Sequence, residues 1–93
     1  MISSSIIKGK NCFISGATGG LGKSIATELV LNQCNLFLTS TKKTKLKKLK
    51  KELSTLNSDI KINYDVCDLR KLNEEKKIIK KFRSTMGNCD ILI

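Results

Sequence analysis

The sequence predicts an α/β fold built on a doubly wound parallel sheet. Two observations predict it: short apolar runs alternate with longer amphipathic segments, and four of the six glycines lie together between the first apolar run and the first amphipathic segment. Parallel strands need a long crossover, usually a helix, to bring the chain back to the same end of the sheet. The chain has 93 residues, a length that suits one domain.

Four strands and three helices are expected in alternating order. The strands are expected at 11–15, 36–39, 60–64 and 90–93, and the helices at 21–32, 42–56 and 69–86. In the second helix one stripe should face the sheet while the lysines face water, because leucines recur there at intervals of three and four, at Leu46, Leu49, Leu53 and Leu56. Right-handed crossovers place the strands in the order 3-2-1-4.

The first and third helices should also bury one apolar stripe each. The expected stripes are Leu21, Ile25 and Leu29 in the first helix, and Leu72, Ile79, Phe82 and Met86 in the third. Asp68 is expected to cap the third helix, because a short carboxylate accepts a hydrogen bond from a free N–H group of the first turn. Gly87 is expected to end that helix.

The two ends of the chain suggest that it is part of a longer domain and that it carries no signal peptide. The run 90–93 reads as the start of a buried strand, so residues 1–93 are expected to be the N-terminal part of one dinucleotide-binding domain, truncated after the start of strand four. The first seven residues are too short and too polar for a signal peptide, and no apolar stretch is long enough to span a bilayer. We expect a cytoplasmic protein that makes no membrane contact.

Composition argues against a metal site and a disulfide framework. The four cysteines, Cys12, Cys34, Cys67 and Cys89, are widely spaced, and the chain has no histidine. Small reduced thiols in apolar surroundings are expected instead.

The net charge of +10 invites a nucleic-acid interpretation, which the residue types weaken. The positive charge comes from sixteen lysines and two arginines, and only four side chains are aromatic. Bidentate phosphate recognition favours arginine, and single-strand binding favours exposed aromatic side chains. A solvated basic surface is the favoured interpretation, and a nucleic-acid partner is not expected.

The glycine-rich stretch is the candidate phosphate-binding loop. Gly16 can turn the chain sharply out of a strand, Gly20 lets the backbone approach phosphates, and Gly22 lets the next helix pack close to the sheet. The helix then offers unpaired N–H groups to an anion. The predicted cofactor-binding residues here are Gly16, Ala17, Thr18, Gly19, Gly20, Leu21 and Gly22.

The stretch from Ser15 to Gly22 resembles the T-G-x-x-x-G-x-G motif of the short-chain dehydrogenase/reductase family, with Ser15 in place of the usual Thr. Asp65-Val66-x-Asp68 is similar to the family's adenine-contacting segment, and 90–93 looks like the strand that runs into its N-N-A-G motif. The resemblance implies a Rossmann-type fold, a nicotinamide dinucleotide, and hydride transfer to or from a carbonyl or alcohol carbon of a small molecule. It also implies a homo-oligomer when the protein is complete.

The spacing of the glycines fits two branches of the family. Gly16, Gly19 and Gly22 also fit G-x-x-G-x-x-G, the spacing of the extended branch that acts mostly on nucleotide sugars. The short spacing between landmarks looks more like the shorter branch, which is favoured. Within it, Thr41 matches a cofactor-contacting Thr of 3-oxoacyl-carrier-protein reductases.

The choice of nicotinamide cofactor depends on the residues after the second strand. An enzyme that uses NAD usually offers a carboxylate there, whereas 39–43 reads T-S-T-K-K. Hydroxyls and lysines can bind a 2′-phosphate, so NADP(H) is favoured over NAD(H). The resemblance further implies that Asp65 accepts a hydrogen bond from the adenine amino group and that Val66 lies against the ring.

No catalytic residue is expected in this chain. The family uses a Ser, a Tyr and a Lys, the last two in Y-x-x-x-K, but Tyr64 is followed at that distance by Asp68. We therefore expect the cofactor-binding half of an oxidoreductase. The two rival functions are a non-catalytic dinucleotide-binding module and a basic nucleic-acid-binding protein.

Overall fold

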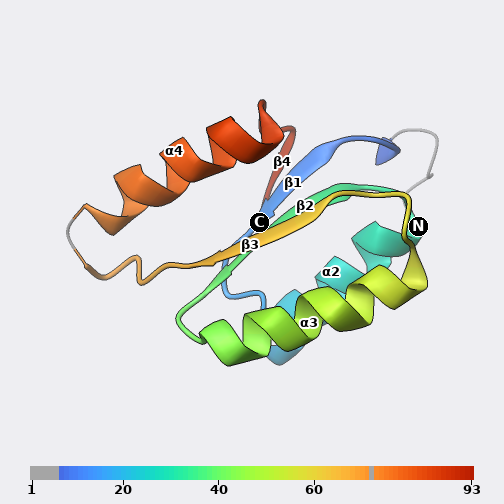
Figure 1. Ribbon diagram of the computed structural model, residues 1–93, viewed down its shortest axis with the longest axis horizontal. Helices are drawn as coiled ribbons and strands as arrows, with labels where there is room; N and C mark the ends of the chain where they lie inside the picture. Colours follow the sequence, from blue (N-terminus) through green and yellow to red (C-terminus); the bar gives the residue numbers. More distant parts are fainter. Residues whose placement is uncertain (1–6, 72) are drawn as a thin grey trace.

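The described residues, 7–71 and 73–93 of a computed structural model, form four strands and three helices in alternating order. In chain order these are β1 (Asn11–Ile14), α2 (Gly20–Leu31), β2 (Asn35–Ser40), α3 (Lys43–Leu56), β3 (Ile62–Val66), α4 (Glu74–Met86) and β4 (Ile91–Leu92). All pairings are parallel and the sheet order is β3-β2-β1-β4, which confirms the predicted topology. Helices α2 and α3 cover one face of the sheet and α4 covers the other (Figure 1).

Alternate side chains of β2 divide the core into two parts. Leu36 and Leu38 are fully buried among residues of α2 and α3. Phe37, between them in sequence, faces α4, where its ring meets Phe82 edge-on with 5.5 Å between centroids. Phe13 of β1 stacks on Phe37 at 5.8 Å. The division follows from the strand itself, in which successive side chains face opposite sides of the sheet.

The predicted stripe of α3 is confirmed except at the helix end, whereas in α2 Leu29 is buried as predicted and Ile25 is only partly buried. Leu46, Leu49 and Leu53 are buried, and α2 buries Ala26, Leu29 and Val30. Leu21, expected to be buried, is 77% exposed, and Leu56 is 49% exposed. Both residues lie in terminal turns, where periodicity continues but the helix has less sheet to pack on.

The predicted start of the third helix was wrong. Helix α4 begins at Glu74, and Asn73 before it makes no side-chain capping bond. The Asp68 carboxylate does not cap a helix; it accepts hydrogen bonds from the backbone N–H and the guanidinium of Arg70, each at 3.0 Å, and so stabilises a turn. Gly87, with φ of 86°, ends α4 as expected.

The buried face of α4 is also shifted from the predicted one. Ile78, Phe82 and Met86 are buried at intervals of four, whereas Ile79, expected in the core, is 43% exposed. Both sets fit a helical period, so the sequence pattern alone could not separate them. Leu72, the fourth expected member, lies outside the described residues.

Strand β3 lies two residues later than the predicted 60–64. The turn after α3 is longer than expected and includes a hydrogen bond from the N–H of Asp59 to Asn57 Oδ1 at 2.9 Å. The shift pairs Thr39 with Asp65 and Ser40 with Val66. It therefore brings Asp65 and Val66 into the strand, at its carboxyl end. Within 7–71 and 73–93, no helix has the length and apolar character needed to cross a membrane.

Candidate functional site

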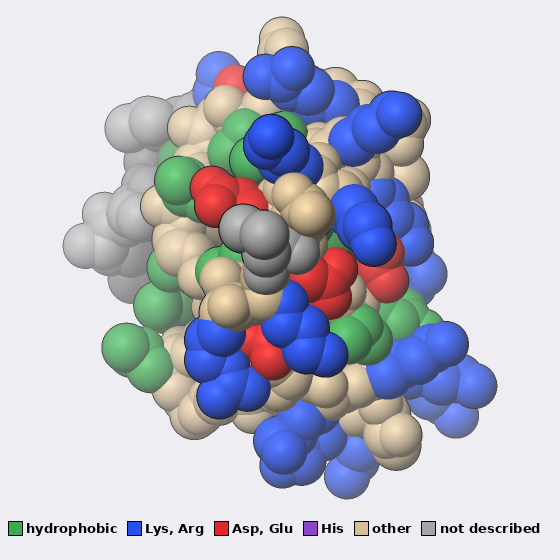
Figure 2. Space-filling view, turned by 90° about the vertical axis from the view of Figure 1, so that its left-hand side faces the viewer, with side chains coloured by type: hydrophobic (Ala, Val, Ile, Leu, Met, Phe, Trp, Pro, Cys, Tyr) green, Lys and Arg blue, Asp and Glu red, His purple; other side chains and the backbone are tan. Residues whose placement is uncertain are grey.

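The predicted site residues gather at one edge of the sheet. Because all strands are parallel, β1, β2 and β3 end at the same edge, after Ile14, Ser40 and Val66 (Figure 1). Figure 2 views the molecule from this side and shows Lys and Arg side chains around the top, right and bottom of the face, with most of the acidic side chains nearer its middle. Ligands of open α/β sheets bind at this edge, where the strand order changes direction.

The glycine loop leaves β1 in the conformation that the sequence requires. Gly16 has φ of 61°, a left-handed conformation that glycine adopts without strain. The next residue, Ala17, is fully buried and donates its N–H to the Thr39 carbonyl at 3.0 Å. The Gly19 N–H then bonds to the Gly16 carbonyl at 3.1 Å, and α2 begins at Gly20.

The later glycines differ in what the fold demands of them. A Cβ atom at Gly22 would clash with the Gly16 carbonyl oxygen and lie 3.0 Å from Ala17 Cα, so the close approach of α2 to the loop requires glycine there. A Cβ at Gly20 would meet nothing within 4 Å. The fold itself does not need glycine at Gly20, and the space beside it is open to a ligand.

The first turn of α2 fits an anion. Its N-cap, Gly19, offers no capping side chain, and no acidic residue lies in the first turn. The first backbone N–H to bond within the helix is that of Lys23, to the Gly19 carbonyl at 2.9 Å. The preceding N–H groups, of Gly20, Leu21 and Gly22, have no carbonyl partner inside the helix. Together with the helix dipole they can hold a pyrophosphate.

The end of β2 offers fewer hydroxyls than the sequence suggests. Thr39 Oγ1 donates to the Ile14 carbonyl at 3.2 Å, and Ser40 Oγ lies 2.7 Å from Thr18 Oγ1 and accepts the Lys42 N–H at 3.1 Å. Both side chains are buried: Thr39 joins β2 to the end of β1, and Ser40 holds the glycine loop against β2. Thr41 is exposed and is the first hydroxyl after the strand that a ligand can reach.

The predicted adenine-contacting residues lie beside Ser40 on β3. Val66 is 37% exposed, as a ring contact would require. The Asp65 carboxylate is already engaged, since Oδ1 accepts the Val66 N–H at 2.8 Å and Oδ2 pairs with Lys81 Nζ at 2.9 Å. No sequence pattern marked Lys81 as a partner of Asp65, because it is one of several lysines on α4.

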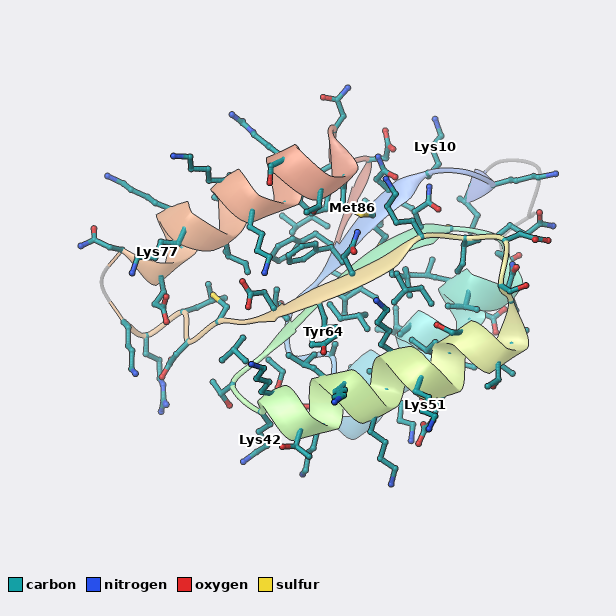
Figure 3. The ribbon with its side chains drawn as sticks, viewed as in Figure 1. Lys10, Lys42, Lys51, Tyr64, Lys77 and Met86 are labelled. Carbon is teal, nitrogen blue, oxygen red and sulfur yellow. The ribbon has the colours of Figure 1, made fainter. Side chains whose placement is uncertain are left out.

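Ser15, which precedes the glycine loop, and Tyr64, the tyrosine of this chain, both have structural partners. Ser15 donates both its N–H and its Oγ hydroxyl to the Ile93 carbonyl, at 2.9 and 3.0 Å. Tyr64 lies between β3 and α3 (Figure 3), and Lys50 Nζ stands 5.8 Å from the centre of its ring. Tyr64 therefore packs with the core rather than facing the glycine loop.

A larger hollow on the other side of the sheet reaches Ser15 but none of the glycines of the loop. It has a volume of about 1130 Å³ and is bounded by α4, β1 and β4, with Phe13, Phe82 and Leu92 in its walls. None of the predicted cofactor-binding residues lines it. We assign the candidate site to the glycine loop, because that loop offers N–H donors suited to an anion whereas the hollow is mainly apolar.

Comparison with curated proteins identifies relatives of this chain. Residues 10–93 match the model of the short chain dehydrogenase family. The chain is 36% identical over 78 residues to "Putative steroid dehydrogenase 4" of Caenorhabditis elegans, covering 84% of this chain and 29% of that protein. It is 34% identical over 82 residues to a very-long-chain 3-oxoacyl-CoA reductase of Vanderwaltozyma polyspora, covering 83% of this chain and 23% of that protein. The chain thus spans between about a quarter and a third of the length of these relatives.

Solved structures share the fold. The L-sorbose reductase of Gluconobacter frateurii, solved with NADPH and L-sorbose, has a TM-score of 0.86 and 22% identity, over 92% of this chain and 32% of that one. A short chain dehydrogenase from Mycobacterium smegmatis has a TM-score of 0.88 and 20% identity, over 99% of this chain and 38% of that one. With the family match over residues 10–93, the conclusion is that this chain belongs to the short chain dehydrogenase family.

Proposed function

We propose that this chain supplies the cofactor-binding part of an NADP(H)-dependent oxidoreductase, which moves a hydride between the nicotinamide and a carbonyl or alcohol carbon. The observation that carries the proposal is the close approach of α2 to Gly16, which leaves the uncapped start of the helix beside open space at Gly20. A pyrophosphate suits that position. The family match supports the hydride chemistry.

The preference for NADP(H) over NAD(H) is part of the proposal. No carboxylate follows β2 in 41–43, and the Asp65 carboxylate on the neighbouring strand is paired with Lys81. A 2′-phosphate would therefore meet hydroxyl and ammonium groups rather than an unpaired acid. Among structures with this fold, the L-sorbose reductase was solved with NADPH and a metagenomic short-chain oxidoreductase with NADP, which supports the choice.

We also propose that residues 1–93 form one partial domain and that the catalytic groups lie outside it. The single tyrosine of the chain, Tyr64, packs toward α3, and Asp68 stands where the family's motif has lysine. The predicted cofactor contacts of Thr41, Asp65 and Val66 are retained in this proposal, with Lys81 holding the Asp65 carboxylate in place.

The proposed substrate class is a 3-oxoacyl thioester. Two relatives at 34% and 31% identity are named very-long-chain 3-oxoacyl-CoA reductases, which supports the acyl part of the assignment. The carrier-protein form of the thioester is proposed from the resemblance of Thr41 to a cofactor-contacting Thr of 3-oxoacyl-carrier-protein reductases. We further propose that the complete protein is cytoplasmic, in keeping with four free cysteines in the described residues. That it forms a homo-oligomer is proposed from the family resemblance alone.

A fluorescence titration with NADPH tests the cofactor site. Gly20→Val places a branched side chain where the pyrophosphate must approach, so NADPH affinity should fall at least about tenfold. The fold should persist, since a Cβ at Gly20 meets nothing within 4 Å and its φ lies outside the left-handed region. The control, Lys47→Gln with Lys51→Gln on the exposed side of α3, should change NADPH affinity less than about twofold.

Three results would contradict the proposal. Unchanged NADPH affinity in a folded Gly20→Val protein would remove the glycine loop as the site. Salt-dependent binding of a DNA duplex that the lysine control weakens, with no NADPH binding, would favour the nucleic-acid alternative. A longer protein that binds NADPH and reduces no carbonyl compound would instead be a non-catalytic dinucleotide-binding module.

A further inference from the structure

A second, smaller hollow lies between α2 and α3, next to the glycine loop. Its volume is about 230 Å³, and it is lined by Thr18, Lys23, Lys45, Lys48, Leu49 and Glu52. At roughly 30 Å³ for each water in the liquid, this is room for a phosphate group with part of its hydration shell. The α3 residues of the lining follow the spacing of one helix face, whereas Lys47 and Lys51 lie on other faces.

The charge in this hollow is unbalanced. Lys23 Nζ pairs with Glu52 Oε2 at 3.2 Å, so the one carboxylate of the lining is already neutralised. The other ion pairs within residues 7–71 and 73–93 join Arg70 to Asp68 and Lys81 to Asp65, neither of which lies in this hollow. Lys45 and Lys48 therefore bring two positive charges that no carboxylate of the lining offsets.

The position of the hollow relates it to the cofactor. Thr18 forms part of its wall and is hydrogen-bonded to Ser40, the last residue of β2, at 2.7 Å. With a pyrophosphate at the start of α2, the adenosine ribose would reach the end of β2, beside Thr18. A phosphate on the 2′-oxygen of that ribose would then project toward the gap between α2 and α3.

We propose that Lys45 and Lys48, with the Thr18 hydroxyl, bind the 2′-phosphate of NADP(H) and determine the preference over NAD(H). This inference rests on the proposed function and assigns the specificity to α3 rather than to the residues that directly follow β2. Lys42 directly precedes α3, at the N-terminal end of that helix (Figure 3). Neither Lys42 nor Lys43 lines the hollow. A phosphate dianion gains attraction from both lysines, and NADH offers them no partner.

Binding of NADPH, NADH and 2′,5′-ADP to the full chain tests this assignment without requiring turnover. Lys45→Gln with Lys48→Gln should lower the affinity for NADPH and for 2′,5′-ADP about tenfold, or ~1.4 kcal/mol, and change that for NADH less than about twofold. The matched control, Lys47→Gln with Lys51→Gln, removes the same charge from the same helix and should change all three affinities less than about twofold.

The inference and the proposed function fail in different ways. If the wild-type chain prefers NADPH and the Lys45 and Lys48 variant retains that preference, the inference is wrong and the cofactor site stands. The inference is equally wrong if this variant loses NADPH and NADH affinity to the same extent, or if Lys42→Gln alone abolishes the preference. If the wild-type chain binds neither dinucleotide, both the inference and the proposed function are wrong.

Discussion

The hydroxyl oxygens of Thr18 and Ser40 lie 2.7 Å apart, although 22 residues separate them in the chain. This bond joins the glycine loop to the end of β2. Thr18→Val removes it and leaves the buried Ser40 hydroxyl with the Lys42 N–H alone. We expect a loss of about 1 kcal/mol in the free energy of unfolding, measured by urea denaturation.

The conservative variant isolates the hydroxyl in that experiment. Thr18→Ser keeps an oxygen within reach of Ser40, so most of the stability should return. Thr27→Val, a matched change on α2 where the hydroxyl bonds only to the Lys23 carbonyl, should cost much less. Equal losses at Thr18 and Thr27 would show that the bond between loop and strand contributes nothing particular.

Gly22→Ala and Gly20→Ala should have opposite effects on folding. A methyl group at Gly22 would clash with the Gly16 carbonyl oxygen, so α2 must shift away from the loop at a cost of about 1–3 kcal/mol. At Gly20 the methyl group meets only open space, and alanine stabilises a helical position by about 0.5–1 kcal/mol relative to glycine. Thermal unfolding followed by circular dichroism would show the difference. A Gly22→Ala protein as stable as wild type would mean that the helix does not pack as described.

The Asp68–Arg70 pair gives a prediction about pH. Hydrogen bonds from Arg70 lower the pKa of Asp68 from 3.8 to about 2. A carboxyl whose folded-state pKa is depressed stabilises the fold above its unfolded value, and this contribution is lost as the pH falls from about 4 to about 2. In Arg70→Met, NMR titration of the Asp68 carboxyl should give a pKa closer to 3.8. Arg83→Met is the control and should leave the pKa of Asp68 low.

Cys89 should react with an alkylating reagent before Cys12 does. Cys12 is fully buried, and that burial, with Cys34 and Cys89 adding, raises its pKa to about 12. Cys89 is exposed. Because the thiolate is the reactive form, iodoacetamide at about pH 8 should label Cys89 in the native chain and spare Cys12 until denaturant is added. Peptide mass spectrometry would detect the order, and rapid native labelling of Cys12 would contradict the burial described.

Sequence patterns were enough for the topology and the loop because both depend on local signals. Apolar runs and helical periods are contained in each segment, and the strand order follows from the handedness of the crossovers. Gly16 makes the predicted turn, and Gly22 allows the predicted close packing of α2 against the loop.

The side-chain roles that sequence analysis missed depend on a partner that is distant in sequence, or on a nearby residue that competes for the same side chain. Asp68 had two available roles, a helix cap or a turn with Arg70, and the turn prevailed. Lys81 pairs with Asp65 across 16 positions, and no pattern marks it among the other lysines. Lys48 is exposed, as its place in the helical period predicts, but the period gives no sign that it also lines the hollow beside Thr18. Such pairings depend on how helices sit on the sheet.

The bonds that join the glycine loop to β2 also bear on how a ligand would be captured. Ala17 is tied to Thr39 and Thr18 to Ser40, so the loop is ordered by the folding of the sheet. The entropy of fixing that backbone is lost during folding, and none of it opposes binding. A dinucleotide would therefore meet a preorganised receptor, with association governed by diffusion and electrostatic attraction rather than by closure of the loop.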